Sequence, residues 1–413
     1  MLTIIKDYSK LDKSILNVIT VEFFVQMINV TFMAILPLYM QAEGYSDAEY
    51  AHFTSYRYLG MLALALFLGM YIKGRRILPL FYFAAFGVPF FGLLILIGVQ
   101  IHSTPLLLIA HLLWGTAYTF IQIPVLPYIL RNAPLHQHTS AITLNFATWS
   151  IASILSFLFI AVLNSINAII FNEQNLLYGI VCLSFLGLYF ISRVPKQEVI
   201  PALTEKRSNL KGYDWKLIFK ALIPTAIIAF GAGFTIPFIS LFFSNVHNMN
   251  TSQFSYMSFA ASFIVAYAAL WVPKIKEGIG YKRAVPITQS FAIVALIVMA
   301  TTQYYSEHSA AIYIAVGFYL LRQPLMNIAA PMTSDITMKY VGEQNREMTS
   351  GLTSAIWSGS TFFSAILFGI LRHMNVAYVN IFLITAATYI VGVIWYIILI
   401  KDYEKRERAG SIN

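Results

Sequence analysis

Long apolar runs recur along the whole 413-residue chain and constrain its fold more than any other feature. A helix needs about 20 apolar residues to cross the roughly 30 Å hydrocarbon core of a bilayer. The runs are continuous rather than alternating at every second residue, which excludes a membrane-spanning barrel of strands. We therefore expect an all-α membrane protein with twelve transmembrane helices. The twelve windows cover residues 14–40, 48–72, 77–99, 105–130, 142–163, 176–194, 218–245, 253–275, 283–303, 310–334, 348–371 and 376–400.

Composition agrees with a chain that is solvated by lipid. It is 58% hydrophobic and only 11% charged, whereas soluble domains average about 25% charged residues. The net charge of +9 does not indicate a nucleic-acid partner, because the basic residues separate apolar runs instead of clustering on one soluble face. The first apolar run is too long for the core of a cleaved signal peptide. Cys182 is the only cysteine, so an intrachain disulfide is excluded.

The positions of the basic residues predict how the chain is oriented. If both termini are cytoplasmic, nearly all Lys and Arg residues lie at helix ends or in loops on the cytoplasmic side. Arg372 falls in an outer loop, and Arg57 and Arg322 fall inside predicted helices. Cytoplasmic loops of membrane proteins carry an excess of Lys and Arg. We expect a multi-pass protein of a bacterial inner (plasma) membrane with both termini inside.

The two halves of the chain resemble each other. TLNFATWSIAS at 143–153 and GLTSAIWSGST at 351–361 align without a gap and match Trp149 with Trp357. Both stretches open the fifth window of their half, and a long polar interval separates the halves. We therefore expect two pseudo-symmetric six-helix bundles joined by a cytoplasmic linker. The predicted domains are residues 1–194, the linker 195–217, and residues 218–413.

Two halves of six helices with a basic central loop resemble the major facilitator superfamily. Its loop signature of glycine, acid, glycine and basic residues appears between windows eight and nine as KEGIGYKR, and between windows two and three as the shorter GMYIKGRR, which lacks the acid. In such loops, basic side chains hold two helix ends together by meeting an acid or helix carbonyl groups. The resemblance implies a gating role in the cytoplasmic loops for Gly69, Gly74, Arg75, Arg76, Glu277, Gly280, Lys282 and Arg283.

Two departures disfavour one branch of this superfamily. Its proton-coupled drug exporters often carry arginine at the position that corresponds to His111 in HLLWG. The fifth window, SIASILSFLFIA, also lacks the glycine and proline of their antiporter signature. The resemblance implies the major facilitator fold and alternating access around a central site. In that fold helices 1, 4, 7 and 10 line the cavity, and helices 2, 5, 8 and 11 flank it.

Polar residues inside the windows are the candidate functional groups. Glu22, Gln26 and Asn29 are spaced i, i+4, i+7 and therefore share one helix face. Charged groups within a membrane are costly and usually mark function, so we expect Glu22 to carry a coupling proton, with His111 as a second proton site. The candidate substrate-binding residues are Gln26, Asn29, Arg57, Trp114, Tyr118, Gln122, Asn145, Trp149, Tyr319, Arg322, Gln323 and Trp357.

Each of these residues also has a structural interpretation. Glu22 can be a hydrogen-bonded carboxyl that never titrates. Arg57 can extend toward the outer interface or form a fixed structural pair. His111 can be satisfied by a neighbour, and the aromatic residues can simply pack. For Arg322, which lies deep in its window, substrate contact is the favoured interpretation.

We therefore predict a monomeric secondary active transporter for a small polar or anionic organic solute, proton-coupled through Glu22. We expect no cofactor, metal or nucleic-acid partner. A proton-driven efflux antiporter for amphipathic drugs is the alternative. An intramembrane enzyme would need convergent chemistry such as HExxH or paired aspartates, and the windows contain neither. A non-transporting receptor or sensor is excluded only by a demonstration of solute flux.

Overall fold

A computed structural model of the chain describes residues 11–72, 74–200 and 212–408. Helices fill almost all of these ranges, which contain no β-strand. Nine helical stretches within them are long and apolar enough to cross a membrane. Lys73 and residues 201–211 of the predicted linker lie outside the described residues.

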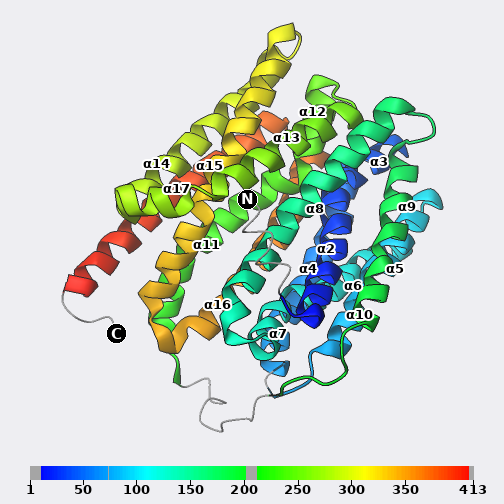
Figure 1. Cartoon of the computed structure of the whole chain (residues 1–413). Helices are drawn as coiled ribbons and strands as arrows, with labels where there is room; N and C mark the ends of the chain where they lie inside the picture. Colours follow the sequence, from blue (N-terminus) through cyan, green and yellow to red (C-terminus); the bar gives the residue numbers. More distant parts are fainter. Residues whose placement is uncertain (1–10, 73, 201–211, 409–413) are drawn as a thin grey trace. The chain divides into compact units, whose positions relative to one another are not determined.

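The described chain forms two compact units, and the first is built around α2. It comprises the described residues within Met1–Ser46 and Phe53–Glu205. Helix α2 packs against α5, α8, α9 and α10, and α5 packs along α6 (Figure 1). Its elements are α2 (Lys13–Ala34), α3 (Leu36–Ala42), most of α4 (Asp47–Tyr71), α5 (Leu78–Gln100), α6 (Thr104–Gln122), α7 (Val125–Asn132), η1 (Leu135–Gln137), α8 (His138–Ile166), α9 (Glu173–Ser184) and α10 (Leu186–Ser192).

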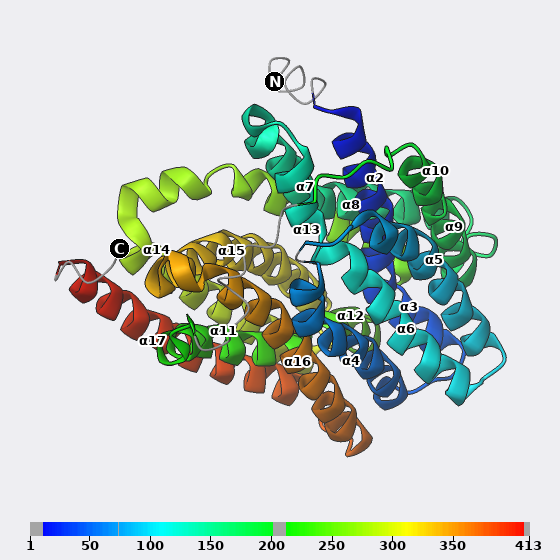
Figure 2. The same cartoon turned by 90° about the horizontal axis from the view of Figure 1, so that it is seen from below.

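The second unit comprises the described residues within Asp47–His52 and Lys206–Asn413. Helix α11 packs against α16 and α17, which lie beside it in Figure 2, and α14 packs along α15. Its elements after the start of α4 are α11 (Trp215–Thr235), η4 (Ile236–Phe238), α12 (Ile239–His247), α13 (Thr251–Ala269), α14 (Val272–Thr301), η5 (Thr302–Tyr305), α15 (Ser309–Val341), η6 (Glu343–Asn345), α16 (Arg346–His373) and α17 (Tyr378–Arg408).

The internal repeat predicted from the sequence is present in the packing of the two units. The first helix of each half packs on the fifth, as α2 on α8 and α11 on α16. A single 3₁₀ turn precedes both α8 and α16. Trp149 and Trp357 are each 41% exposed. Each backbone carbonyl also accepts a 2.8 Å hydrogen bond from the hydroxyl one turn later, Ser153 or Thr361. The predicted all-α fold with two matched bundles is confirmed.

Three of the predicted helices are broken at proline. Pro37 stands at the start of α3, Pro124 between α6 and α7, and Pro237 in the 3₁₀ turn after α11. Proline lacks the backbone N–H that an α-helix needs and its ring clashes with the preceding turn. The windows beginning at residues 14, 105 and 218 therefore each contain a long helix followed by a shorter one.

Candidate functional site

The first unit buries a row of polar side chains on α2. Glu22, Gln26 and Asn29 are 5%, 5% and 3% exposed. Their spacing puts them on one helix face, and that face meets protein rather than lipid because α2 is enclosed by the neighbouring helices. Buried polar groups are costly unless they are hydrogen-bonded, so their contacts matter.

A hydrogen-bonded network joins this row to α4 and α6. Arg57 of α4 donates to the side-chain oxygen of Asn29. The Asn29 amide nitrogen donates to Gln26 Oε1 at 3.0 Å and lies 3.3 Å from the hydroxyl of Tyr118. That hydroxyl in turn donates to Gln26 Oε1 at 3.2 Å. Three helices therefore contribute to one buried polar cluster.

The direction of these bonds follows from arginine chemistry. A guanidinium has donors only, so Asn29 must turn its oxygen toward Arg57 and its nitrogen toward Gln26. The oxygen of Gln26 then accepts from Asn29, which leaves its nitrogen as the group that can interact with Glu22, one turn earlier on α2. The polar row thus begins at a fixed cation, runs through two amides and ends beside a carboxyl group.

Arg57 is held in place by an aromatic surface. Its guanidinium carbon lies 4.0 Å from the centre of the Trp114 ring, a cation–π contact. Trp114 is fully buried and stacks on Tyr118, with ring centres 5.4 Å apart. Arg57 therefore does not extend toward the outer interface, because its side chain is 7% exposed and packs inward.

Two glycines bring α4 and α6 close enough for this arrangement. A Cβ atom on Gly115 would lie 1.9 Å from the backbone oxygen of Arg57, and one on Gly60 would lie 2.1 Å from that of Leu112. Small residues at such positions allow membrane helices to pack backbone to backbone. Gly115 of the sequence motif HLLWG therefore allows α6 to approach α4 closely at Arg57.

The two ends of the network carry unbalanced charge. Glu22 Oε2 and Arg57 Nε are buried and have no hydrogen-bond partner among the residues that the structure describes. Within the same described ranges, neither side chain forms an ion pair. A buried acid and a buried base therefore lie at the two ends of a row of neutral amides.

The other candidates of the first unit lie apart from this network. His111 Nδ1 contacts the Leu107 carbonyl at 2.8 Å on its own helix, and its ring stacks beside Phe53. Asn145 is buried in α8, whereas Gln122 and Trp149 are exposed. Residue spacing on one helix could not show which candidates join the network and which lie apart from it, because that depends on how the neighbouring helices pack.

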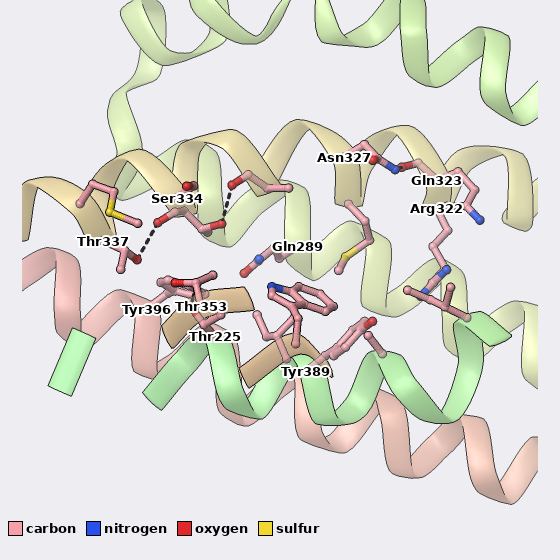
Figure 3. A pocket seen from close by; sticks show the side chains of 18 residues that line it. Thr225, Gln289, Arg322, Gln323, Asn327, Ser334, Thr337, Thr353, Tyr389 and Tyr396 are labelled. Carbon is pink, nitrogen blue, oxygen red and sulfur yellow. Dashed lines mark hydrogen bonds between the residues drawn. The ribbon is translucent and has the colours of Figure 1, made fainter. Parts of the chain in front are cut away.

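The second unit contains a cavity of about 280 Å³ that Arg322, Gln323 and Trp357 line. Figure 3 shows Arg322, Gln323 and Asn327 at one end, and Ser334 and Thr337 at the other. Arg322 is 3% exposed, and Tyr389 of α17 lines the same cavity. Tyr319, one turn before Gln323 on α15, is buried. Further polar groups come from α11, α14, α16 and α17 and were not singled out from the sequence: Thr225, Gln289, Thr353, Tyr389 and Tyr396.

The loop between α4 and α5 is held by residues that the motif does not contain. The Glu198 carboxylate accepts hydrogen bonds from the backbone N–H groups of Ile77, at 2.8 and 2.9 Å, and of Leu78, at 3.1 Å. Arg131 donates to the carbonyl groups of Ile72 and Arg75. GMYIKGRR has no acid of its own, and Glu198 brings a carboxylate from more than a hundred residues away. No local pattern in the sequence could reveal this partner.

Gly74 in that loop has a φ of +64°, a conformation that favours glycine. Gly69 lies within α4, and the side chains of Arg75 and Arg76 are exposed.

The corresponding loop of the second unit is held in a different way. Gly280 has a φ of +66° and interrupts α14. Lys282 pairs with Glu404 of α17 at 3.3 Å, and the Tyr281 hydroxyl donates to Asp335 of α15. Glu277 and Arg283 are exposed. Lys282 therefore pairs with Glu404 and not with Glu277, the acid of the motif.

Sequence comparison decides the family. A family model described as Major Facilitator Superfamily matches residues 18–365. The chain belongs to this superfamily. It is therefore a multi-pass membrane transporter rather than an enzyme, and members of the superfamily bind small molecules within the membrane. No curated protein matches the chain, and the described residues contain no group of three His, Cys, Asp or Glu side chains suited to a metal ion.

Solved structures of other members share the superfamily fold. A D-xylose-proton symporter is 14% identical with a TM-score of 0.71, and the match covers 92% of this chain and 95% of that chain. The nucleoside transporter NupG is 14% identical with a TM-score of 0.71, covering 94% and 99%. An inward-facing bacterial homologue of the iron transporter ferroportin is 12% identical with a TM-score of 0.71, covering 94% and 98%. Identities this low establish the fold and leave the substrate open.

Proposed function

We propose that this transporter is proton-coupled, that Glu22 binds and releases the coupling proton, and that the solute is a small polar or anionic organic molecule. The observation that carries the proposal is the burial of an unpaired Glu22 carboxyl in the middle of α2, with Oε2 lacking a hydrogen-bond partner in the described part of the chain. A carboxyl group at such a depth is seldom kept for stability alone.

The polar row from Arg57 through Asn29 and Gln26 to Glu22 supplies a way to couple the proton to the solute. Donors and a distant cation favour the ionised form of a carboxyl, and dry surroundings favour its protonated form. A solute that binds to Arg57 or Asn29 competes for the same donors and changes this balance. Alternating access then exposes Glu22 to one solution with the solute bound and to the other without it.

His111 is a second candidate proton site of this proposal. It lies one turn before Trp114 on α6 and is 1% exposed. Its Nδ1 is already engaged by the Leu107 carbonyl, so a role would fall on Nε2. Replacing His111 with Gln while Glu22 is intact separates the two sites: a pH-dependence that survives this change assigns the coupling proton to Glu22.

The decisive experiment is transport into proteoliposomes under an imposed pH gradient. Glu22→Gln is expected to abolish accumulation against a gradient while sparing exchange of labelled solute between equilibrated compartments. Each unit of the imposed pH gradient is worth about 1.4 kcal/mol per coupled proton, which corresponds to roughly tenfold accumulation. The matched control is Glu343→Gln, because the side chain of Glu343 is 81% exposed. If Glu22→Gln accumulates solute with unchanged pH-dependence, Glu22 is not the coupling group.

The same vesicles give the direction of transport. Accumulation with inward proton flow supports symport, and expulsion supports the exchange expected of an efflux antiporter. We further propose a bacterial inner membrane and cytoplasmic termini, which the distribution of Lys and Arg supports.

A further inference from the structure

Two side chains that line the cavity of the second unit each carry a buried polar atom, and the two atoms are of opposite kind. Arg322 Nε is a donor and Gln289 Oε1 is an acceptor, and neither has a hydrogen-bond partner among the described residues. Both side chains line the cavity and are more than nine-tenths buried, at 3% and 4% exposed. Figure 3 shows them on different helices, with Gln289 between the two ends of the cavity.

Buried donors and acceptors in proteins are almost always paired, so two unpaired ones in one cavity define what an occupant must supply. Arg322 Nε requires an acceptor, and Gln289 Oε1 requires a donor. One molecule that carries an acceptor and a donor can pair with both atoms. A molecule that carries only acceptors leaves the Gln289 oxygen unpaired, which costs binding free energy.

Charge selects the kind of acceptor. Arg322 is the one charged side chain among the 18 described residues that line the cavity, and none of them is acidic. Guanidinium groups bind carboxylates with planar, charge-assisted hydrogen bonds. The cavity therefore favours an organic anion over a neutral or cationic molecule.

Size and surface limit the rest of the molecule. The cavity of about 280 Å³ is almost twice the roughly 150 Å³ apolar cavity that holds one benzene molecule. Between its polar groups the wall is formed by aliphatic and aromatic side chains, namely Ile228, Ala232, Ile236, Met326 and Trp357. One ring with a short side chain fits this volume and these contacts.

We propose that the cavity binds a compact organic anion with one acidic group at Arg322, an apolar or aromatic body, and a hydrogen-bond donor at Gln289. This inference rests on the proposed transport function and narrows its substrate class. It also disfavours amphipathic cations, because the cavity offers them no carboxylate.

Equilibrium binding to the purified full-length protein tests the inference without any proton gradient. The probes are 3-(4-hydroxyphenyl)propionate, 3-phenylpropionate, which lacks the hydroxyl donor, and tyramine, which replaces the acid by an amine. Isothermal titration is expected to show saturable binding of the hydroxy acid. We expect binding at least fivefold weaker for the acid without hydroxyl, and no competition from tyramine.

Substitutions assign the two groups of the probe to the two walls. Arg322→Gln should weaken binding of both acids at least tenfold, since it removes a charge-assisted hydrogen bond, and Arg322→Lys should restore part of it. Gln289→Leu should make the two acids bind equally, because the hydroxyl then has no acceptor. Arg346→Gln is the matched control, since the side chain of Arg346 is 46% exposed on α16.

The outcomes separate this inference from the proposed coupling. If neither acid binds saturably, or if Arg322→Gln binds them as the native protein does, the inference is wrong even where proton-driven transport of another solute is found. If Glu22→Gln binds the acids normally and both proteins transport them without pH-dependence, the inference stands and the coupling proposal fails. Tyramine binding that survives Arg322→Gln would also overturn the inference.

Discussion

Arg57 of α4 donates a hydrogen bond to the side-chain oxygen of Asn29 on α2 while its guanidinium lies over the ring of Trp114. The pair fixes which way each amide of the network points, because arginine cannot accept a hydrogen bond. A cation on α4 thereby orients the donors that end at Glu22. This relationship makes Arg57 a positioning residue for Glu22 as well as a candidate anion-binding group.

The transport rate should depend on both the charge and the planar shape of the Arg57 side chain. Arg57→Gln removes the donor to Asn29 and the cation on Trp114, so we expect at least tenfold slower transport at equal protein content. Arg57→Lys keeps the charge but lacks the planar fork that bridges an amide and an aromatic face, and should retain an intermediate rate. Initial rates in proteoliposomes measure both changes.

A matched control for Arg57 exists on the surface of the same unit. Arg193 also lies over an aromatic ring, 4.9 Å from the centre of Tyr189, but it is exposed. Arg193→Gln should transport at the native rate. Native rates for Arg57→Gln as well would show that the network does not contribute to transport.

The close approach of α4 and α6 predicts a large loss of stability on adding single methyl groups. Gly115→Ala places Cβ 1.9 Å from the Arg57 carbonyl oxygen, and Gly60→Ala places it 2.1 Å from that of Leu112. Backbone cannot yield as a side chain does, so each change should cost about 3 kcal/mol or more. Thermal unfolding and the fraction of monodisperse protein report the effect.

Gly179 provides the control, because no described atom lies within 4 Å of the Cβ that an alanine would add there. Gly179→Ala lies inside α9 and should be neutral or stabilising by about 0.5 to 1 kcal/mol. Equal unfolding temperatures for Gly115→Ala and Gly179→Ala would contradict the close helix contact.

The sequence predicted the bilayer and the helix windows because continuous apolar runs are a local feature, and it predicted the repeat because one stretch of each half aligns directly with the other. Trp149 and Trp357 were paired by aligning eleven residues from each half, and each side chain is 41% exposed. The sequence could not predict that Gln289 and Arg322 line one cavity, because they lie on α14 and α15 and meet only through packing. Glu22, Gln26 and Asn29 were found together because one helix carries all three.

Helix α8 allows the orientation of the chain to be tested. It is 29 residues long, so its ends are about 43 Å apart. In a Cys182→Ser background, Ile169→Cys after α8 should react with a membrane-impermeant maleimide in intact cells. His136→Cys before α8 should react only after the membrane is opened. The reverse pattern would place the termini outside.

The last prediction concerns Glu198, whose carboxylate caps the start of α5. It satisfies backbone N–H groups of Ile77 and Leu78 that no helical carbonyl can reach. Glu198→Ala should therefore lower stability by about 0.5 to 2 kcal/mol, whereas Glu198→Gln keeps an acceptor oxygen and loses only the charge at the helix terminus. Thermal unfolding of the three proteins should rank the native chain first and the alanine variant last.

A second contact also holds the segment around Glu198 against the rest of the first unit, since the Val199 N–H donates to Asn132 at 2.9 Å. Loss of the carboxylate should thus also speed tryptic cleavage after Lys196. Glu343→Ala, which removes an exposed carboxylate 3.6 Å from Arg346, should change neither the unfolding temperature nor cleavage at Lys196. A Glu198→Ala protein as stable and as resistant to trypsin as this control would mean that the carboxylate does not hold the loop, and that Arg131 alone joins α7 to the loop after α4.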